Sequence, residues 1–342
     1  MNILFDFNHP VDVNVFKNAV KILAAEGHHI LITYRERGIL KKVVETELGD
    51  FHPVKIGKHH RSSFLVKVVG QLCRDCQFIP FYRRNRIDLS VGTSTNVISA
   101  WIMRIPHLAF EDDIEYKLTF THANLFATRH IMPDYIELKK KNIHHYRGLK
   151  ELAYLHPRYY SPRLEELDPY GLKPEEYVFI RKIARVSLNY RKEDDLSLTA
   201  IKKIRGLGLK ILLSLEDKRE REIFEDDCII LQEPIRDIFS LIKFALFCVS
   251  SGDSVAREAC LLGTPTIYTG RREMRVNTDL IALGCLFKED TEEAILNRID
   301  QLVSRQEKDR IRNAVALKIE RDWEDVTQMI LRHVKDFDRS RS

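Results

Sequence analysis

The chain has 342 residues, of which 44% are hydrophobic and 31% are charged, and its formal net charge is +5. This composition is typical of a globular protein that is long enough for two domains, each with a hydrophobic core. The net charge is too small to indicate nucleic-acid binding, and the sequence contains no recognisable nucleic-acid-binding module. We therefore expect no nucleic-acid partner.

The N-terminus and the cysteines indicate the cellular compartment. The opening MNILFDF has a strand pattern without the basic and apolar regions of a signal peptide, and the longest apolar stretch, near 238–249, is interrupted by Lys243. The six cysteines are scattered, and Cys73 and Cys76 form a single C-x-x-C without a second pair. We therefore expect no metal site and a reducing, cytoplasmic environment.

The first half of the chain alternates between strand and helix patterns. Apolar runs predict strands at 2–7, 29–33, 52–56, 88–91 and 107–110, and helical spacing predicts helices at 15–25, 34–48 and 96–103. The opening β-α-β pattern resembles a Rossmann-like domain, but the absence of G-x-G-x-x-G argues against a dinucleotide site. We predict an α/β domain over residues 1–160.

A proline-rich segment, 157–174, is the best candidate for a linker. Beyond it the same alternation resumes, with strands predicted at 177–180, 210–213, 228–231 and 245–249 and helices at 195–206 and 235–244. We predict a second α/β domain over residues 175–322. Two α/β domains place ligand chemistry at the carboxyl ends of their strands.

The stretch SSGDSVAREACLLGTPTIYTG, residues 250–270, is the part of the sequence that packing explains least. It predicts a loop, a helix over 255–262 and a strand over 266–268. Gly263 suits the helix C-terminus, because glycine enters the left-handed region without a Cβ clash. Small residues in the loop leave backbone N–H groups at the helix N-terminus, where an anion such as a phosphate is stabilised. The residues expected to bind a ligand here are Ser251, Gly252, Asp253, Ser254, Arg257 and Glu258.

Glu258 lies one turn into the predicted helix, where its carboxylate could accept hydrogen bonds from the vicinal hydroxyls of a ribose. An alternative interpretation needs no ligand. In that interpretation Asp253 or Ser254 is an ordinary N-cap, and Arg257 forms a surface pair with Glu258.

Two resemblances favour a ligand site. The segment SGDSVAREACLLGTP resembles the donor site of GT-B glycosyltransferases and of UDP-N-acetylglucosamine 2-epimerases, where the loop holds the nucleotide-sugar diphosphate and the helix carboxylate holds the ribose. In addition, MNILFDFNHPVDVNVFK, VKIGKHH, RGLKELAYL and SVAREACLLGTP together resemble the predicted glycosyltransferases of domain of unknown function 354.

The second resemblance covers nearly the whole chain and implies the GT-B fold. This fold has two Rossmann-like parallel-sheet domains facing a central cleft. It also implies that the last helix, at about 323–342, crosses back onto the first domain, with Trp323 marking the crossing.

The proton-accepting residue of such an enzyme is less well defined. The usual pattern, as it resembles this stretch, carries histidines after the first strand, whereas this chain has Asp12, Asn14 and a histidine at His9. An inverting transfer needs a base that takes the proton of the acceptor hydroxyl, and either histidine or aspartate can do this. The candidate catalytic residues are therefore Asp12 and His9, followed by Asp112.

Two further residues lie at predicted strand ends in the second domain. Arg181 would face the diphosphate and stabilise the departing nucleotide, or it is a solvated surface arginine. Glu233 would contact the base or ribose, or it belongs to a plain strand-terminating turn with Pro234.

The similarity to 2-epimerases is weaker around the proton-handling residues. The acid/base aspartate of those enzymes follows a His-Gly pair where this chain has Gly92-Thr93-Ser94, and their later histidine is replaced near Arg181. Only Glu111 matches. The resemblance therefore favours glycosyl transfer over epimerisation.

Residues 55–86 combine basic and apolar side chains. The basic residues are Lys55, Lys58, Arg61, Lys67, Arg74, Arg83, Arg84 and Arg86, against a single acidic residue, Asp75. This composition suits an anionic or lipid-linked acceptor at a membrane surface. It fits equally well an amphipathic helix that packs on the sheet and exposes a solvated basic face.

Together the residues and the resemblance imply a metal-independent glycosyltransferase of surface glycan or glycolipid synthesis. Its expected donor is a UDP sugar, used as co-substrate without a further cofactor, and its expected acceptor is a glycan or a lipid-linked molecule. The alternatives are a UDP-sugar 2-epimerase or hydrolase and a non-catalytic sugar-nucleotide-binding protein. We expect a cytoplasmic monomer or homodimer that contacts the inner membrane face peripherally.

Overall fold

The computed structural model describes all residues except 60–63, 113–116, 184–197, 233–234 and 340–342. It divides the chain into two compact units. Unit 1 comprises Met1–Tyr159 and Trp323–Ser342, and unit 2 comprises Tyr160–Asp322.

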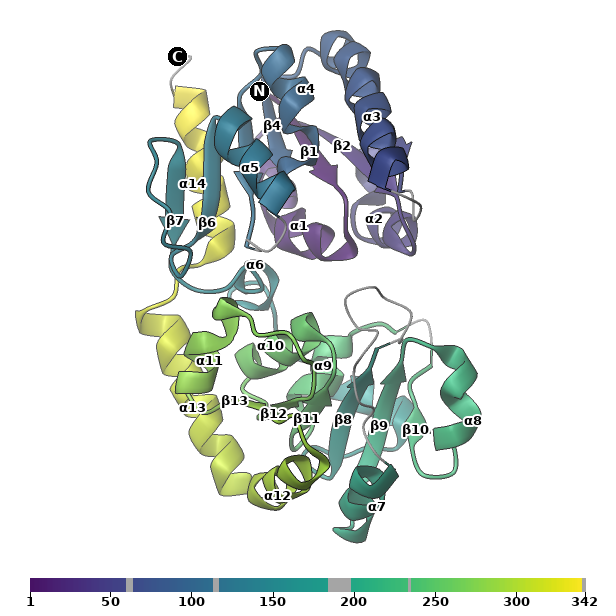
Figure 1. Ribbon diagram of the computed structural model, residues 1–342. Helices are drawn as coiled ribbons and strands as arrows, with labels where there is room; N and C mark the ends of the chain where they lie inside the picture. The colour runs from purple at the N-terminus through teal and green to yellow at the C-terminus, as the bar shows by residue number, and fades with distance from the viewer. Residues whose placement is uncertain (60–63, 113–116, 184–197, 233–234, 340–342) are drawn as a thin grey trace. The chain divides into compact units, whose positions relative to one another are not determined.

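Unit 1 is built on a parallel seven-stranded sheet with the strand order β3-β2-β1-β4-β5-β6-β7 (Figure 1). Its strands are β1 (Asn2–Phe7), β2 (His29–Glu36), β3 (Val54–Lys58), β4 (Leu89–Gly92), β5 (His107–Phe110), β6 (Arg129–Pro133) and β7 (Ile143–Tyr146). Its helices are α1 (Pro10–Ala25), α2 (Leu40–Leu48), α3 (Phe64–Asn85), α4 (Val97–Ile102), α5 (Lys117–Phe126), α6 (Leu152–Leu155) and α14 (Val326–Arg339), with 3₁₀ turns at Gly49–Phe51 and Ser94–Asn96. The order reverses between β1 and β4, and ligands of open α/β sheets bind at such a switch point.

Helix α1 begins at Pro10, earlier than the predicted start at residue 15. His9 is the N-cap, and its Nδ1 accepts a hydrogen bond from Val11 N (3.3 Å). Asp12 Oδ2 in turn accepts from His9 N (2.9 Å), which completes a capping box. The fixed φ of proline suits the first position of a helix. His9 and Asp12 therefore lie at a helix N-terminus, at the carboxyl end of β1.

Strand β2 continues to Glu36, although a helix was predicted from residue 34. Tyr34 is buried and pairs with Phe7 of β1 on one side and Lys55 of β3 on the other. Pairing on both sides outweighs the local helical pattern, so α2 begins only at Leu40.

The last helix of the chain belongs to unit 1. Figure 1 shows α14, in yellow, alongside elements of unit 1, and it packs on α1 and α6. Its inner face buries Met329, Ile330 and Val334. Thr327 Oγ1 donates to Ala153 O of α6 (2.7 Å), so polar as well as apolar contacts hold the helix.

Unit 2 repeats the design with a parallel six-stranded sheet in the order β10-β9-β8-β11-β12-β13. Its strands are β8 (Tyr177–Lys182), β9 (Lys210–Leu215), β10 (Ile229–Ile230), β11 (Cys248–Ser250), β12 (Thr266–Tyr268) and β13 (Leu286–Lys288). Its helices are α7 (Leu198–Gly206), α8 (Arg221–Phe224), α9 (Ile238–Lys243), α10 (Asp253–Leu261), α11 (Thr278–Ala282), α12 (Glu292–Leu302) and α13 (Arg305–Arg321), with 3₁₀ turns at Leu164–Tyr170, Lys218–Glu220 and Arg275–Asn277. The switch point lies between β8 and β11.

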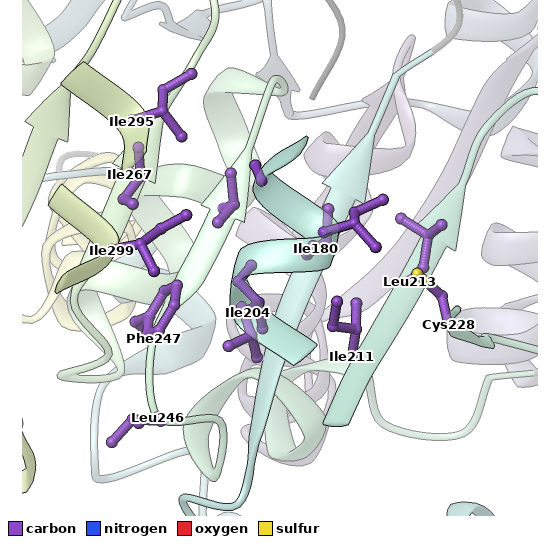
Figure 2. Packing of buried hydrophobic residues seen from close by; sticks show 14 of the residues in the cluster. Ile180, Ile204, Ile211, Leu213, Cys228, Leu246, Phe247, Ile267, Ile295 and Ile299 are labelled. Atoms are coloured by element: carbon purple, nitrogen blue, oxygen red, sulfur yellow. The ribbon is translucent and has the colours of Figure 1, made fainter. Parts of the chain in front are cut away.

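The core of unit 2 fills the space between the sheet and the helices α7 and α12. In Figure 2, Ile180 and Leu213 of adjacent strands lie near Ile204 of α7, whereas Ile299 of α12 lies near Phe247. Parallel strands covered by helices on both faces are apolar along their whole length, which explains why the apolar runs predicted these strands.

The segment between the two sheets packs within unit 2. Tyr160 OH hydrogen-bonds to Ser240 Oγ (2.9 Å), and Arg163 N donates to the same oxygen (2.8 Å). Most of the predicted linker, 157–174, therefore contributes to this unit, which begins at Tyr160. Within the described ranges, no helix is both long and apolar enough to cross a membrane.

Candidate active site

The loop after β11 is fixed against the carboxyl end of β8. Ser251 N donates to Arg181 O (3.1 Å), and Ser251 Oγ accepts from Ile183 N (3.0 Å). A Cβ at Gly252 would lie 3.1 Å from Ile183 Cγ2, so glycine permits the close approach of the loop to β8. The predicted residues Arg181, Ser251 and Gly252 are thus brought together at the switch point.

Helix α10 begins directly after this loop. Its N-cap is Gly252, which has no side chain to accept hydrogen bonds from the amides of the first turn. Tyr268 OH donates to Asp253 Oδ1, and Arg272 Nη1 donates to Asp253 Oδ2 (2.8 Å). The alternative in which Asp253 or Ser254 is the N-cap is therefore wrong, because Asp253 is the first helical residue. Its carboxylate is bound by Tyr268 of β12 and by Arg272 of the following loop instead.

Glu258 and Arg257 are buried in α10, with 6% and 3% of their surfaces exposed. This burial contradicts the alternative of a solvent-exposed surface pair. Arg257 Nη1 lies 3.7 Å from Met274 Sδ. Burial and the charge of the Glu258 carboxylate raise the pKa of the Cys248 thiol. A desolvated carboxylate makes strong hydrogen bonds to hydroxyl donors.

Arg181 projects from β8 and is bound to neighbouring strand residues. Its Nη1 donates to Ser214 Oγ (2.9 Å), and its Nη2 lies 3.7 Å from Glu216 Oε2. It is a partly exposed, positioned cation at the strand edge rather than a freely solvated one. Glu233 lies outside the described residues.

In unit 1, Asp12 is a carboxylate that titrates close to neutrality. Its Oδ2 accepts from both Asn8 N and His9 N (2.9 Å each). Desolvation raises the pKa of Asp12 to about 6, against the opposing effects of these hydrogen bonds and of the Lys150 cation. A general base is most effective when its pKa lies near the working pH.

His9 differs from Asp12 in the direction of its pKa shift. Desolvation and the cations Arg37 and Lys150 lower the pKa of His9 to about 4. Its imidazole is therefore neutral at pH 7, and it is a weaker base than a group whose pKa is closer to neutrality.

The carboxyl end of β5 adds two more carboxyl groups. Desolvation raises the pKa of Glu111 to about 7, helped by the neighbouring charges of Asp112 and Asp12, while Ser94 N donates to Glu111 Oε1 (2.8 Å). Asp112 Oδ1 accepts from Lys150 Nζ (2.8 Å). The Asp112 carboxylate is thus engaged in an ion pair with the Lys150 cation, whereas Asp12 Oδ2 is bound by backbone amides.

A buried ion pair supports the same edge of the sheet. Asp6 Oδ1 of β1 lies 2.7 Å from Arg74 Nη2 of α3, and both side chains have no exposed surface. Asp6 also accepts from Thr33 Oγ1 (2.7 Å) and Asn8 Nδ2 (3.1 Å). This network fixes the residue that precedes His9 and connects it to α3.

Several of these residues were not singled out from the sequence. Arg272 lies just beyond the stretch 250–270, and its contact with Asp253 depends on the turn after β12. Lys150 was present in a recognised segment, but only its ion pair with Asp112 gives it a role. Glu111 was named from the sequence for its match to the epimerase pattern, whereas its raised pKa beside Asp112 and Asp12 follows only from the structure. In the part of the chain that the structure describes, no three His, Cys, Asp or Glu side chains are arranged to hold a metal ion.

Comparison with known proteins identifies the family. Residues 1–338 match the family described as "Protein of unknown function (DUF354)". The chain belongs to this family, as the sequence predicted. An uncharacterised protein of Methanocaldococcus jannaschii is 22% identical over 290 residues, which cover 80% of this chain and 83% of that protein.

Solved structures resemble the chain over nearly its whole length. The UDP-GlcNAc 2-epimerase of Neisseria meningitidis, bound to UDP-GlcNAc, has a TM-score of 0.69 at 11% identity, covering 98% of this DUF354 chain and 100% of that one. The UDP-GlcNAc 2-epimerase of Methanocaldococcus jannaschii has a TM-score of 0.67 at 13% identity, covering 98% and 99%. A structure described as the glycotransferase of kitacinnamycin has a TM-score of 0.66 at 11% identity, covering 98% of each chain. At these identities the likeness shows the fold, and the predicted GT-B fold with two Rossmann-like parallel-sheet domains is confirmed.

Proposed function

We propose that this DUF354 protein is a glycosyltransferase that uses a nucleotide sugar, with a UDP sugar as donor. The observation that carries the proposal is the N-terminus of α10. It follows the switch point between β8 and β11, its N-cap Gly252 provides no side-chain acceptor, and Glu258 lies buried within the same helix. The positive end of a helix suits a diphosphate, and a buried carboxylate suits the ribose hydroxyls.

Arg181 supplies the positive charge that glycosyl transfer needs at the leaving group. When the bond between sugar and diphosphate breaks, negative charge develops on the departing nucleotide, and a positioned cation stabilises that charge. Arg181 is held in place by Ser214 and Glu216 at the carboxyl edge of β8. The proposal therefore requires neither a metal ion nor a further cofactor.

Asp12 is the proposed base. Its carboxylate would accept the proton of the acceptor hydroxyl as the hydroxyl oxygen bonds to the anomeric carbon. Its pKa of about 6 leaves it mainly ionised at neutral pH while keeping it basic enough for proton transfer. We further propose that the acceptor is a glycan or a lipid-linked molecule and that the product enters a surface glycan or glycolipid.

A second candidate function is 2-epimerisation or hydrolysis of a UDP sugar. It is favoured by Glu111, whose raised pKa of about 7 allows it to exchange a proton at neutral pH. It is disfavoured because Gly92-Thr93-Ser94 stands where the epimerase pattern has its His-Gly pair. Incubation with UDP-GlcNAc alone distinguishes the two, because epimerisation needs no acceptor and its product is visible by proton NMR.

The donor site is tested by calorimetric titration with UDP and UDP-GlcNAc. Glu258→Ala is expected to weaken binding by about 1 to 3 kcal/mol, which is about 5- to 150-fold, because charge-assisted hydrogen bonds to the ribose are lost. Glu293→Ala, which removes an exposed carboxylate from α12, serves as the matched control. Equal affinity of wild type and Glu258→Ala for every nucleotide that binds would refute this donor site. Binding without turnover in any acceptor mixture would favour the non-catalytic alternative.

A further inference from the structure

Helix α3 exposes an apolar face. Val69 and Leu72 are each 57% exposed, and Val66 and Val68 are 42% and 36% exposed. Cys73 and Cys76 are also exposed and complete what we call the α3 apolar face, namely Val66, Val68, Val69, Leu72, Cys73 and Cys76. Large exposed apolar patches with polar surroundings are typical of protein or membrane interaction sites.

The exposed basic side chains that the structure describes in this segment lie at its two ends, namely Lys55, Lys58, Arg83, Arg84 and Arg86. Arg74 is turned inward and buried against Asp6, and between Val66 and Pro80 every exposed side chain that the structure describes is uncharged. Arg61 and the Lys67 side chain lie outside the described residues. The exposed positive charges that the structure describes therefore flank the apolar face.

These flanking charges lie at both ends of the α3 apolar face. Arg83 and Arg84 are exposed in the last turn of α3, and their helical spacing aligns them with Leu72 and Cys73 three turns earlier. Lys55 and Lys58 of β3 line a pocket of about 990 Å³ together with Val66, Val69 and Glu36. Glu36 pairs with Lys55 (3.5 Å), so Lys58 is the lysine of this pocket whose charge is less compensated. Apolar side chains between clusters of cations match the interface of an anionic lipid surface.

The inner side of α3 touches the candidate active site. Gln71 Nε2 donates to Thr95 O (2.5 Å) in the turn after β4, and Arg74 binds Asp6 at the end of β1. One helix therefore holds the edge that carries His9 and Asp12 and at the same time presents the apolar face to its surroundings.

We propose that the α3 apolar face docks on anionic membranes and brings the edge of unit 1 to a lipid-linked acceptor. The proposed membrane contact does not depend on the proposed function. The proposal of a lipid-linked acceptor, in contrast, rests on the proposed glycosyltransferase function. A second copy of the chain is a poorer occupant, because it would bring the same cationic flanks, Lys55, Lys58, Arg83 and Arg84, into the contact.

Flotation with vesicles tests the docking. Wild type is expected to float with vesicles of phosphatidylcholine and phosphatidylglycerol at low salt, but not with pure phosphatidylcholine. Val69→Asp with Leu72→Asp is expected to lower the bound fraction at least about 10-fold. Ile281→Asp with Leu317→Asp, which changes side chains of similar exposure in unit 2 (50% and 46%), should float like wild type. Arg83→Glu with Arg84→Glu should weaken binding about 10-fold or more, because each basic residue contributes several-fold at an anionic surface.

Three readouts keep the outcomes separate. Thermal unfolding verifies that each variant is folded, and light scattering reports its oligomeric state. Wild type that stays in the lower fraction with anionic vesicles, or a Val69→Asp, Leu72→Asp variant that floats like wild type, would overturn the proposal. The proposal would also be overturned if the wild type is a dimer that does not float and Val69→Asp with Leu72→Asp converts it to monomers. In that case the α3 apolar face is a surface of self-association. Nucleotide titration of the wild type and of the two α3 variants judges the donor site independently, since the substitutions in α3 lie in unit 1 and the proposed donor site lies in unit 2.

Discussion

Asp12 has a structural role and a proposed catalytic role that depend on the same carboxylate. It completes the capping box of α1 by accepting from the amides of Asn8 and His9, and its raised pKa supports the proposal that it is the base. The capping contacts fix the direction of the carboxylate, because Oδ2 is bound to the backbone. His9 contributes to the same turn, but its lowered pKa makes it neutral and weakly basic at pH 7.

Asp12→Asn is expected to lower turnover by about 10²- to 10⁴-fold while nucleotide affinity stays unchanged, because a general base acts on the acceptor. The wild-type rate should rise with pH through about 6, since the basic form of Asp12 appears as its carboxyl loses a proton. The assay is run with EDTA, so that activity also tests metal independence. Asp50→Asn, which alters an exposed carboxylate, is the control. A profile that rises near pH 4 would identify His9 as the base instead.

Helix α3 is the element that joins an apolar surface to the interior of the sheet. Its inner face carries Gln71, Arg74 and Phe78, and the Arg74 guanidinium also lies over the Phe78 ring at 4.9 Å. Gly57 of β3 has φ +77°, and a Cβ there would lie 2.9 Å from the Arg74 side chain. The arginine therefore crosses β3 at a position where glycine is required.

Arg74→Met is expected to lower the free energy of unfolding by about 3 to 5 kcal/mol, because Asp6 would remain buried without its cation. The double change Asp6→Asn with Arg74→Met should cost less than Arg74→Met alone, since the uncompensated charge is removed. Lys55→Met removes an exposed pair with Glu36 and should change stability by less than about 1 kcal/mol. Urea unfolding measures all three. A double variant less stable than Arg74→Met would contradict this account of the pair.

The elements differ in how far the sequence predicted them. Apolar runs located strands β1, β4, β5, β8, β9 and β12, because strands buried between helices are apolar throughout. Gly263 was correctly placed after α10, with φ +76°. The start of α1 was missed, because histidine is an unusual N-cap and Asn8-His9-Pro10 has a loop-like composition.

The candidate site was predictable only in its local parts. The loop and helix at 250–262 are contiguous in sequence, so small residues and helical spacing identified them. Asp6 and Arg74 are 68 residues apart, and Asp253 and Arg272 are 19 apart. Such pairs form only when particular strands and helices become neighbours in the fold. Local sequence patterns do not predict these neighbours. The pKa shifts of Asp12 and Glu111 likewise come from burial in the folded state.

At the scale of the whole molecule, the chain enters unit 2 once and returns to unit 1. Trp323 is buried at the return, next to Gly148, whose φ of +110° allows a close approach. Helix α14 then covers α1 and α6, so unit 1 contains both ends of the chain. Each unit has its own core and can respond separately to a substitution.

Ile330→Ala is expected to destabilise unit 1 by about 2 to 5 kcal/mol, because it leaves a cavity where α14 packs on the unit. Ile299→Ala, equally buried in the core of unit 2, should destabilise that unit by a similar amount. Hydrogen exchange resolved by peptide measures the two separately. Faster exchange confined to unit 2 in Ile330→Ala would contradict the assignment of α14 to unit 1.

The position of α14 at the end of the chain has a consequence for biosynthesis. Domains generally fold as they leave the ribosome, the N-terminal one first. Here the sheet of unit 1 is made before unit 2 and helix α14 of unit 1 is made after it, so every residue of unit 2 emerges before Trp323. Unit 2 is therefore the first complete folding unit. The apolar surface of α1 and α6 stays uncovered until α14 has been made. A chain that ends prematurely after Asp322 would keep the proposed donor site but leave the unit that carries Asp12 unfinished.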